Sequence, residues 1–182
     1  TTGVKDFDSI ALASDHTWSF TTRPAPVSEI ATTVSVGSEF SCAIISNQAK
    51  CWGYNSYGQL GQGDTQSRGD HSLEMGDNLP AIDLGSGLLP VSIVTGLSHA
   101  CALLDNGSVK CWGYNSSGRL GLGDTANRGD NPDEMGNNLP VVELGAGRTA
   151  KQLVAGADYT CARLDDDSVK CWGYNGYGNL GL

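Results

Sequence analysis

Six cysteines are the residues whose type and spacing most clearly allow chemistry in this sequence. They form three local pairs: Cys42 with Cys51, Cys101 with Cys111, and Cys161 with Cys171. In a β-hairpin, the residue numbers of two directly opposed residues add up to the same value for every pair, so each pair is centred on the turn. The second and third pairs are centred on Asn106 and Asp166, each the middle of a three-residue turn, and the first pair on a two-residue turn, Ser46-Asn47. Opposed Cα atoms in an antiparallel pair lie ~4.5 Å apart, which is within disulfide range.

Three hairpin disulfides indicate an oxidising compartment, so we expect an extracellular or cell-surface protein. The alternative is three reduced pairs that pack between sheets as small hydrophobic side chains. A zinc site is disfavoured because a two-cysteine hairpin supplies half of a tetrahedral site and no histidine accompanies every pair. A thiol redox role lacks the C-x-x-C motif.

Acidic residues are the second group that could do chemistry. The segment L-G-x-G-D-T-x-x-R-G-D occurs twice and is followed each time by E-M-G-x-N-L-P. Its carboxylates could supply oxygen ligands to calcium, although their spacing matches no EF-hand. The calcium candidates are Asp64, Asp70, Glu74 and Asp77 in the first copy, and Asp124, Asp130, Asp133 and Glu134 in the second. The alternative is a turn-rich loop in which Asp and Asn bond backbone amides and Arg68 or Arg128 pairs with a carboxylate.

Catalysis finds no support in the pattern, and we expect no enzyme. The three histidines, His16, His71 and His99, lie in three different contexts, and no nucleophile-and-base group can be assembled from residues that occur once. The net charge of −9 opposes binding to nucleic-acid phosphates. No apolar run reaches the length of a membrane span, so we expect no membrane insertion.

A repeated phrase shows which elements must position these residues. C-W-G-Y-N begins at Cys51, Cys111 and Cys171, so the copies lie 60 residues apart. Such a period indicates stacked supersecondary units, none of which can bury its apolar face alone. The middle unit predicts short strands at 91–95, 100–104, 109–113 and 140–144, with a tight hairpin turn at 105–107. The segment 80–84 is the fourth strand of the preceding unit, and no segment has a helical pattern.

The motif resembles the repeats of the regulator of chromosome condensation, and the resemblance covers about residues 30 to 182. It rests on His99, Ala102, Leu103, Val109, Trp112, Gly113, Asn115, Gly118, Leu120 and Gly121. It implies an all-β fold of four-stranded antiparallel propeller blades, of which known members close seven into a ring. We therefore expect about three blades, as an incomplete propeller or as part of a larger ring or assembly.

Two segments are expected. Residues 27–182 carry the repeats, with a last blade that lacks its fourth strand. Residues 1–26 resemble the end of a bacterial immunoglobulin-like domain followed by a linker. Alternatively, residues 17–22 form a strand that completes the first blade.

The tryptophans of the repeated phrase are expected to pack between blades. In a propeller both faces of an inner strand are covered, so Trp52, Trp112 and Trp172 should fill the gap to the neighbouring blade. A sugar-binding aromatic platform would have a similar sequence.

The expected function is therefore non-catalytic. The first hypothesis is an extracellular repeat scaffold that binds protein partners or another ligand and needs no cofactor. The alternative is a self-assembling structural subunit of a surface fibre or filament, in which copies of the chain complement one another by strands or blades. The nucleotide-exchange and chromatin roles of the family do not carry over, because the acidic charge and the expected disulfides argue against a nuclear protein.

Overall fold

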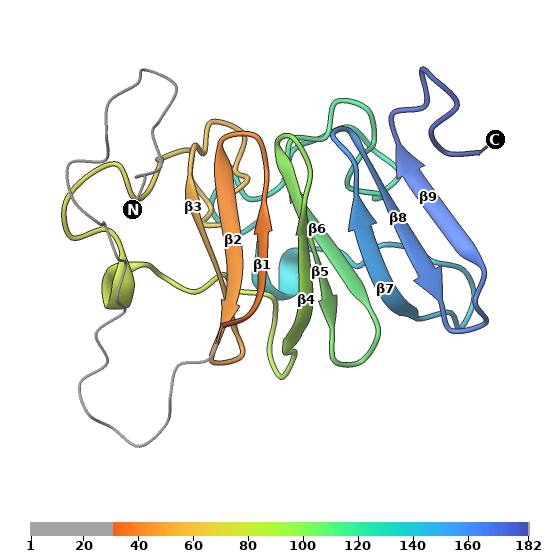
Figure 1. Ribbon diagram of the computed structural model, residues 1–182, viewed down its shortest axis with the longest axis horizontal. Coiled ribbons are helices and arrows are strands. Elements are labelled where there is room, and N and C mark those ends of the chain that lie inside the picture. Colours follow the sequence, from red (N-terminus) through yellow and green to blue (C-terminus); the bar gives the residue numbers. More distant parts are fainter. Residues whose placement is uncertain (1–30, 182) are drawn as a thin grey trace, which may run out of the picture.

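The structure is a computed structural model in which residues 31–181 are described (Figure 1). The interpretations of residues 1–26 lie outside these residues. The described strands are β1 (Ala31–Val36), β2 (Phe40–Ile45), β3 (Gln48–Gly53), β4 (Pro90–Thr95), β5 (His99–Leu104), β6 (Val109–Gly113), β7 (Ala150–Ala155), β8 (Tyr159–Leu164) and β9 (Val169–Gly173). Two single turns of 3-10 helix, η1 (Gly76–Asn78) and η2 (Gly136–Asn138), interrupt the connections. Within the described part of the chain, no helix is long and apolar enough to span a membrane.

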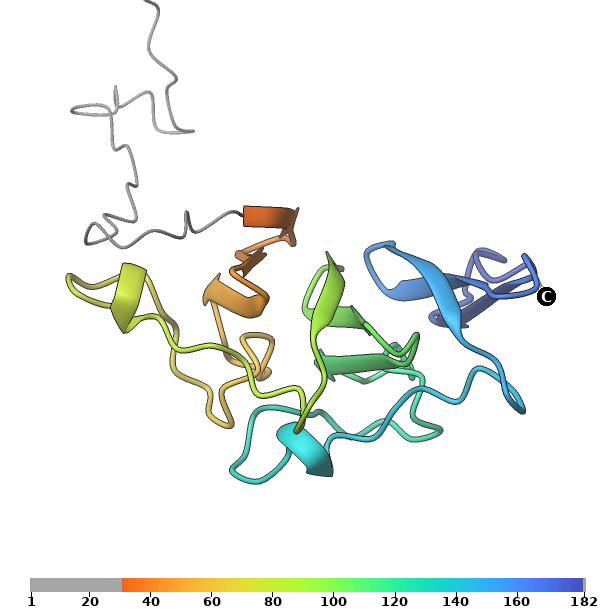
Figure 2. The same cartoon turned by 90° about the horizontal axis from the view of Figure 1, so that it is seen from below.

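The strands form three antiparallel sheets, each with three strands in sequence order. We call β1–β3 blade 1, β4–β6 blade 2 and β7–β9 blade 3. The blades stand side by side in Figure 1, and the view from below in Figure 2 shows them fanned along an arc. The all-β, propeller-type fold predicted from the repeats is confirmed, and the described blades form an open, incomplete propeller.

The predicted fourth strand of each blade is wrong. Residues 80–84 and 140–144 are extended but belong to no sheet. The first segment follows β3 through one backbone bond, from the Ile82 N–H to the Ala49 carbonyl at 2.8 Å, and the second segment makes the equivalent bond to β6.

Proline and lysine explain why no ladder forms there. Pro80 has no N–H to donate. At the other end of the same segment, Lys110 Nζ of blade 2 donates to the Leu84 carbonyl at 2.9 Å. Lys170 of blade 3 holds the Glu143 carbonyl in the same way, at 2.8 Å. The segment that would complete each blade is therefore bonded to a side chain of the next blade.

The cysteines of each pair lie directly opposite one another, as the turn centring predicts. A disulfide joins each pair, with Cα–Cα distances of 4.1, 4.0 and 4.0 Å from blade 1 to blade 3. The bridges of blades 1 and 2 are fully buried, whereas Cys161 and Cys171 are partly exposed. Each bridge therefore ties the middle strand of one blade to its third strand.

The repeated tryptophan links each blade to the one before it. Trp112 Nε1 donates to the Gln59 carbonyl at 3.0 Å, and Trp172 Nε1 donates to the Arg119 carbonyl at 3.1 Å. A Cβ atom added to Gly61 would lie 2.9 Å from Trp112 Nε1, so the ring packs where only glycine leaves room. Trp52 of blade 1 is half-buried.

The core consists of two apolar layers between the blades. The layer between blades 1 and 2 is built around Trp112, and the layer between blades 2 and 3 around Trp172. Strands β5 and β6 are buried along their whole length because blade 2 has a neighbour on each side. The blades are thus stabilised by one another, as expected for stacked units.

The ring-over-glycine contact predicts a difference between two substitutions. Gly121 and Gly181 have φ of 71° and 72°, but only Gly121 faces a ring, that of Trp172, whose nearest atoms lie 2.9 Å from the added Cβ. Alanine should cost about 1–2 kcal/mol at either position through the left-handed backbone. At Gly121 it should cost a further ~1–3 kcal/mol through overpacking.

Urea unfolding of Gly121→Ala and Gly181→Ala measures this difference, and equal losses of unfolding free energy would contradict the packing argument.

Burial predicts the order in which the disulfides are reduced. Cys161 and Cys171 are partly exposed, whereas Cys101 and Cys111 are 0% exposed. Because a thiol must reach a sulfur to attack it, the bridge of blade 3 should be reduced first. Limited reduction, alkylation and peptide mass spectrometry measure the order. Earlier alkylation of the blade 2 pair would show that burial does not set it.

Candidate binding site between the first two blades

A buried asparagine organises the long loop that follows each tryptophan. We call the loop between β3 and β4 (residues 54–89) the excursion of blade 1, and the loop between β6 and β7 (residues 114–149) the excursion of blade 2. Asn55 is 0% exposed, and its side-chain oxygen accepts the Leu60 N–H at 2.9 Å. Its amide nitrogen donates to the carbonyls of Asp64 and Gln66 at 2.9 and 3.0 Å. Asn115 makes the equivalent bonds in blade 2. The repeated asparagine thus serves the loop itself.

Two of the calcium candidates are paired with arginine. Asp64 accepts from Arg68 at 2.7 Å, and Asp124 accepts from Arg128 at 2.7 Å. The hydrogen bond from Arg68 holds the pKa of Asp64 below its ordinary value. The structure therefore contains the arginine pairing that the sequence offered as the alternative to calcium.

Two further candidates, Asp70 and Asp130, lie later in the same loops. Asp70 is 3.1 Å from His71 Nδ1, and these residues with Glu74 are the only possible metal-binding group within residues 31–181. Asp70 and His71 are exposed, and Glu74 already accepts backbone N–H groups of its own loop. Asp130 lies beside Glu134, and burial together with that carboxylate raises the Asp130 pKa. The four aspartates thus share no common site.

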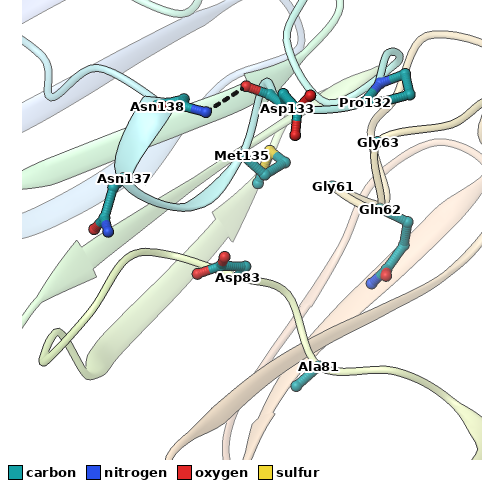
Figure 3. A pocket seen from close by; sticks show the side chains of 10 residues that line it. All are labelled: Gly61, Gln62, Gly63, Ala81, Asp83, Pro132, Asp133, Met135, Asn137 and Asn138. Carbon is teal, nitrogen blue, oxygen red and sulfur yellow. Dashed lines mark hydrogen bonds between the residues drawn. The ribbon is translucent and has the colours of Figure 1, made fainter.

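A cavity of about 660 Å³ opens between the excursions of blades 1 and 2 (Figure 3). Its walls combine two carboxylates, three amides, a thioether and backbone. The lining residues are Gly61, Gln62, Gly63, Ala81, Asp83, Pro132, Asp133, Met135, Asn137 and Asn138. Residues 61–63 and 81–83 come from the excursion of blade 1, and residues 132–138 from that of blade 2.

The two carboxylates stand on different sides of this cavity, with Met135 between them in Figure 3. Asp83 Oδ1 accepts the Gly85 N–H at 2.9 Å. The Asp133 carboxylate makes no hydrogen bond or ion pair within the described part of the chain, whereas its backbone carbonyl accepts from Asn138 at 2.9 Å. The cavity thus offers carboxylate oxygens beside an apolar thioether.

A lysine that feels the charge of Asp83 is already engaged. Lys110 is buried, and its ammonium donates to the carbonyls of Leu84 at 2.9 Å and Gly136 at 2.7 Å. Burial lowers the pKa of Lys110, and the nearby Asp83 opposes this. None of the residues that line the cavity is basic. The cavity therefore suits a cationic group from outside the described residues.

Sequence reasoning assigned Asp83 to a strand and missed its place in this cavity. Asp133 was among the calcium candidates. Asp83 and Asp133 lie far apart along the chain, so the sequence did not indicate that both excursions line the same cavity.

A second feature that sequence reasoning missed is a polar contact that only blades 2 and 3 make. His99 is 0% exposed, and its Nε2 lies 2.9 Å from Thr160 Oγ1. At the equivalent positions of blades 1 and 2 the chain has Phe40 and Ala100. Burial, with a smaller contribution from the Arg119 charge, lowers the pKa of His99 to about 3.

Arg119 completes this polar contact. Its side chain is 6% exposed, and Nη1 donates to Asp158 Oδ1 at 2.7 Å. The guanidinium carbon lies 4.8 Å from the centre of the Tyr114 ring, which itself stacks on Tyr57 at 4.4 Å. The equivalent of Arg119 in blade 1 is Gln59. Blades 2 and 3 are thus joined by an ion pair that blades 1 and 2 lack.

Comparisons with known proteins agree with this blade architecture. Two family models described as the regulator of chromosome condensation (RCC1) repeat match the chain, one at residues 91–119 and 150–179 and the other at residues 106–163. The chain belongs to the RCC1-like repeat family. The interpretation of the tryptophan motif is therefore confirmed, and the matches cover all strands from β4 to β9.

Curated relatives of this RCC1-like chain are much longer. It is 35% identical to the ultraviolet-B receptor UVR8 of Arabidopsis thaliana over 132 residues, which cover 72% of this chain and 26% of UVR8. It is 29% identical to the probable E3 ubiquitin-protein ligase HERC4 of Homo sapiens over 136 residues, which cover 75% of this chain and 11% of HERC4.

Solved structures show the same fold at lower identity. Human WBSCR16 superposes with a TM-score of 0.62 at 23% identity, covering 84% of this chain and 37% of that chain. Yeast RCC1 (Prp20), in a crystal structure with Kap60, gives a TM-score of 0.58 at 18% identity, covering 82% of this chain and 31% of that chain.

The buried histidine predicts an acid-sensitive interface. The pKa of His99 is about 3 in the folded chain and ~6.5 in the unfolded chain. Between these values only the unfolded chain binds the proton, so the stabilisation is complete above about pH 6.5 and is lost as the pH falls toward 3. The loss should be roughly 2 kcal/mol between about pH 7 and about pH 5.

Urea unfolding at the two pH values tests this in the double variant His99→Phe/Thr160→Ala, which copies the blade 1–blade 2 pair. The variant should lose less stability than the original chain as the pH falls. An equal loss would assign the acid sensitivity to other groups.

Proposed function

We propose that this chain is a non-catalytic extracellular scaffold that binds a protein partner through the cavity between blades 1 and 2. The observation that carries the proposal is the placement of Asp83 and Asp133 on different sides of that cavity, with Met135 between them and no basic lining residue. A lysine or arginine side chain of a partner matches this arrangement. Its stem would pack on the thioether and its charged head would meet the carboxylates.

A binding role is consistent with what related proteins do. Crystal structures describe yeast RCC1 (Prp20) bound to Kap60, and Prp20p of Saccharomyces cerevisiae together with its binding properties to Gsp1p and histones. Those proteins thus bind other proteins. For the present chain we infer a protein partner as well, and the net charge of −9 favours a basic partner over a nucleic acid.

Three disulfides support the extracellular assignment. Such bridges persist in oxidising compartments and are rare in cytosolic and nuclear proteins, where thiols are kept reduced. The repeated polar residues support the non-catalytic assignment. Asn55, Arg68 and their equivalents bond their own loops, so these repeated groups have a structural role.

A neutral analogue tests the cationic partner. Acetyl-arginine-amide should shift the amide NMR signals of residues that line the cavity, and acetyl-citrulline-amide should not, because citrulline keeps the shape without the charge. Asp133→Asn should weaken arginine binding about two- to fivefold, as for an ion pair at a solvent-accessible site.

Asp77→Asn is the matched control, since Asp77 is exposed, lies outside the cavity and loses the same charge. It should leave the affinity for the arginine probe unchanged. Equal shifts with both probes, or full affinity in Asp133→Asn, would refute the cationic site.

Self-assembly is the second candidate function, and one comparison within the chain favours it. Val109 and Val169 occupy the same position in blades 2 and 3, on the surface that faces the following blade. Val109 is 0% exposed because blade 3 covers it, whereas Val169 is 67% exposed. This open apolar surface is the kind to which another blade binds.

A further inference from the structure

Two blade surfaces have no neighbouring blade within residues 31–181. We call the surface of blade 1 that points away from blade 2 the leading face, and the surface of blade 3 that points away from blade 2 the trailing face. Five residues of the leading face are compared with their counterparts on the trailing face. The pairs are Val36 with Val154, Glu39 with the Asn179 side chain, Ser41 with Tyr159, Trp52 with the Asn179 carbonyl, and Tyr54 with Tyr177.

The two existing blade contacts provide a template for what each face binds. The hairpin registers fix which positions are equivalent, because the bridged cysteines occupy the same place in all three blades. A contact between the trailing face of one copy and the leading face of another would place side chains in pairs that can be read from these registers.

The tyrosines form the first such pair. Tyr57 of blade 1 stacks on Tyr114 of blade 2, with ring centres 4.4 Å apart. Tyr177 of blade 3 occupies the position of Tyr57 and lies on the trailing face. Tyr54 of blade 1 occupies the position of Tyr114 and lies on the leading face. Tyr177 is 89% exposed and Tyr54 is 40% exposed. Both rings of a second tyrosine pair between blades are therefore present, one on each face.

The inner strands form the second pair. Ser35 of blade 1 and Thr95 of blade 2 share a hydrogen bond of 2.8 Å between their hydroxyl groups. The same positions on the two open faces are Val154 and Val36, which are 53% and 70% exposed. The contact between blades 1 and 2 thus has two hydroxyl groups at these positions, and the contact between the open faces would have two valines. Neither contact would place a hydroxyl against a methyl group.

The third pair follows the same rule. Blades 2 and 3 join His99 to Thr160 by a hydrogen bond, whereas blades 1 and 2 have two apolar residues, Phe40 and Ala100. The open faces have Tyr159 and Ser41 at these positions. A phenol and a hydroxyl form a hydrogen bond, so this pair is also matched.

The fourth pair concerns charge. Arg119 of blade 2 meets Asp158 of blade 3 at 2.7 Å. The equivalent residues on the open faces are Asn179 and Glu39. An amide N–H donates to a carboxylate, so an acid on one face again meets a donor on the other.

The tryptophan contact supplies the fifth element. Each Trp Nε1 donates to the carbonyl of the residue in the Gln59 or Arg119 position, beside a glycine that leaves room for the ring. The trailing face repeats this socket with the Asn179 carbonyl and Gly181, and no atom lies within 4 Å of a Cβ added to Gly181. Trp52 on the leading face is the ring that fits it.

From these five matches we propose that the trailing face binds the leading face of a second copy of this chain, head to tail. The proposal rests on self-assembly, the second candidate function, and names its partner and its contact residues. Such a contact is heterologous, so successive copies form a closed ring or an open filament according to the rotation at each contact. The occupant is a copy of this chain because blade 1 matches blade 3 at every compared position.

Disulfide trapping tests the pairing directly. Val36→Cys and Val154→Cys are made in separate full-length chains, purified with the native bridges intact, and mixed under mild oxidation. Both sites are exposed, so both variants should fold. The mixture should give a covalent dimer linked through positions 36 and 154, identified by peptide mass spectrometry. Val154→Cys mixed with Leu73→Cys is the matched control, because Leu73 is 83% exposed and lies on neither face.

A second measurement follows the association itself. Sedimentation velocity of the unmodified chain should show a mass that rises with concentration. Tyr177→Ser, which copies the residue at position 117, removes one ring of the expected stack. It should weaken association about three- to tenfold without lowering the thermal midpoint, since Tyr177 is exposed.

The outcomes separate this inference from the function on which it rests. A dimer linked through positions 36 and 154 in clear excess over the control supports the head-to-tail contact. Association without that link, or association unaffected by Tyr177→Ser, overturns the contact and leaves self-assembly standing. A chain that stays monomeric at every concentration overturns both.

Discussion

The rest of the structure depends on one packing constraint: the indole rings of blades 2 and 3 each rest on a glycine of the blade before. A single hydrogen bond to a backbone carbonyl fixes the ring's direction, as Trp112 shows on Gln59. Full burial of such a ring removes 150–250 Å² from water, which is worth roughly 4–6 kcal/mol as an upper estimate. No blade can obtain this stabilisation alone. The disulfides link strands within each blade, and the indole contacts link neighbouring blades.

Local features could be predicted from the sequence because local rules determine them. The strand at 109–113 and the facing cysteines follow from turn length and from the two-residue period of a strand, and the structure has both. The fourth strand could not be excluded in this way. Its loss depends on Lys110 and Lys170, which reach from the next blade to the carbonyls that a ladder would use. Such contacts depend on how units stack, which a pattern within one unit does not contain.

The candidate site was only partly visible in the sequence, for the same reason. Asp133 stood out as an acidic residue in a repeated loop, but Asp83 was assigned to a strand. The cavity exists because two excursions from neighbouring blades border one space. Polar contacts between blades, such as His99 with Thr160, were equally hidden, because each residue is unremarkable within its own unit. The repeats thus reveal the architecture, and the positions at which they differ carry the specificity.

The 60-residue period also bears on how the gene for this chain can change. Unequal recombination between two repeats would remove or add one whole unit and leave the reading frame of the blades intact. Loss of residues 61–120 would bring Trp172 onto the Gln59 carbonyl beside Gly121, an equivalent socket. The same event would set Thr160 opposite Phe40, leaving a buried hydroxyl without its hydrogen-bond partner at a cost of about 1–3 kcal/mol. The tryptophan contact therefore tolerates a change in blade number, whereas the polar pairs between blades oppose it.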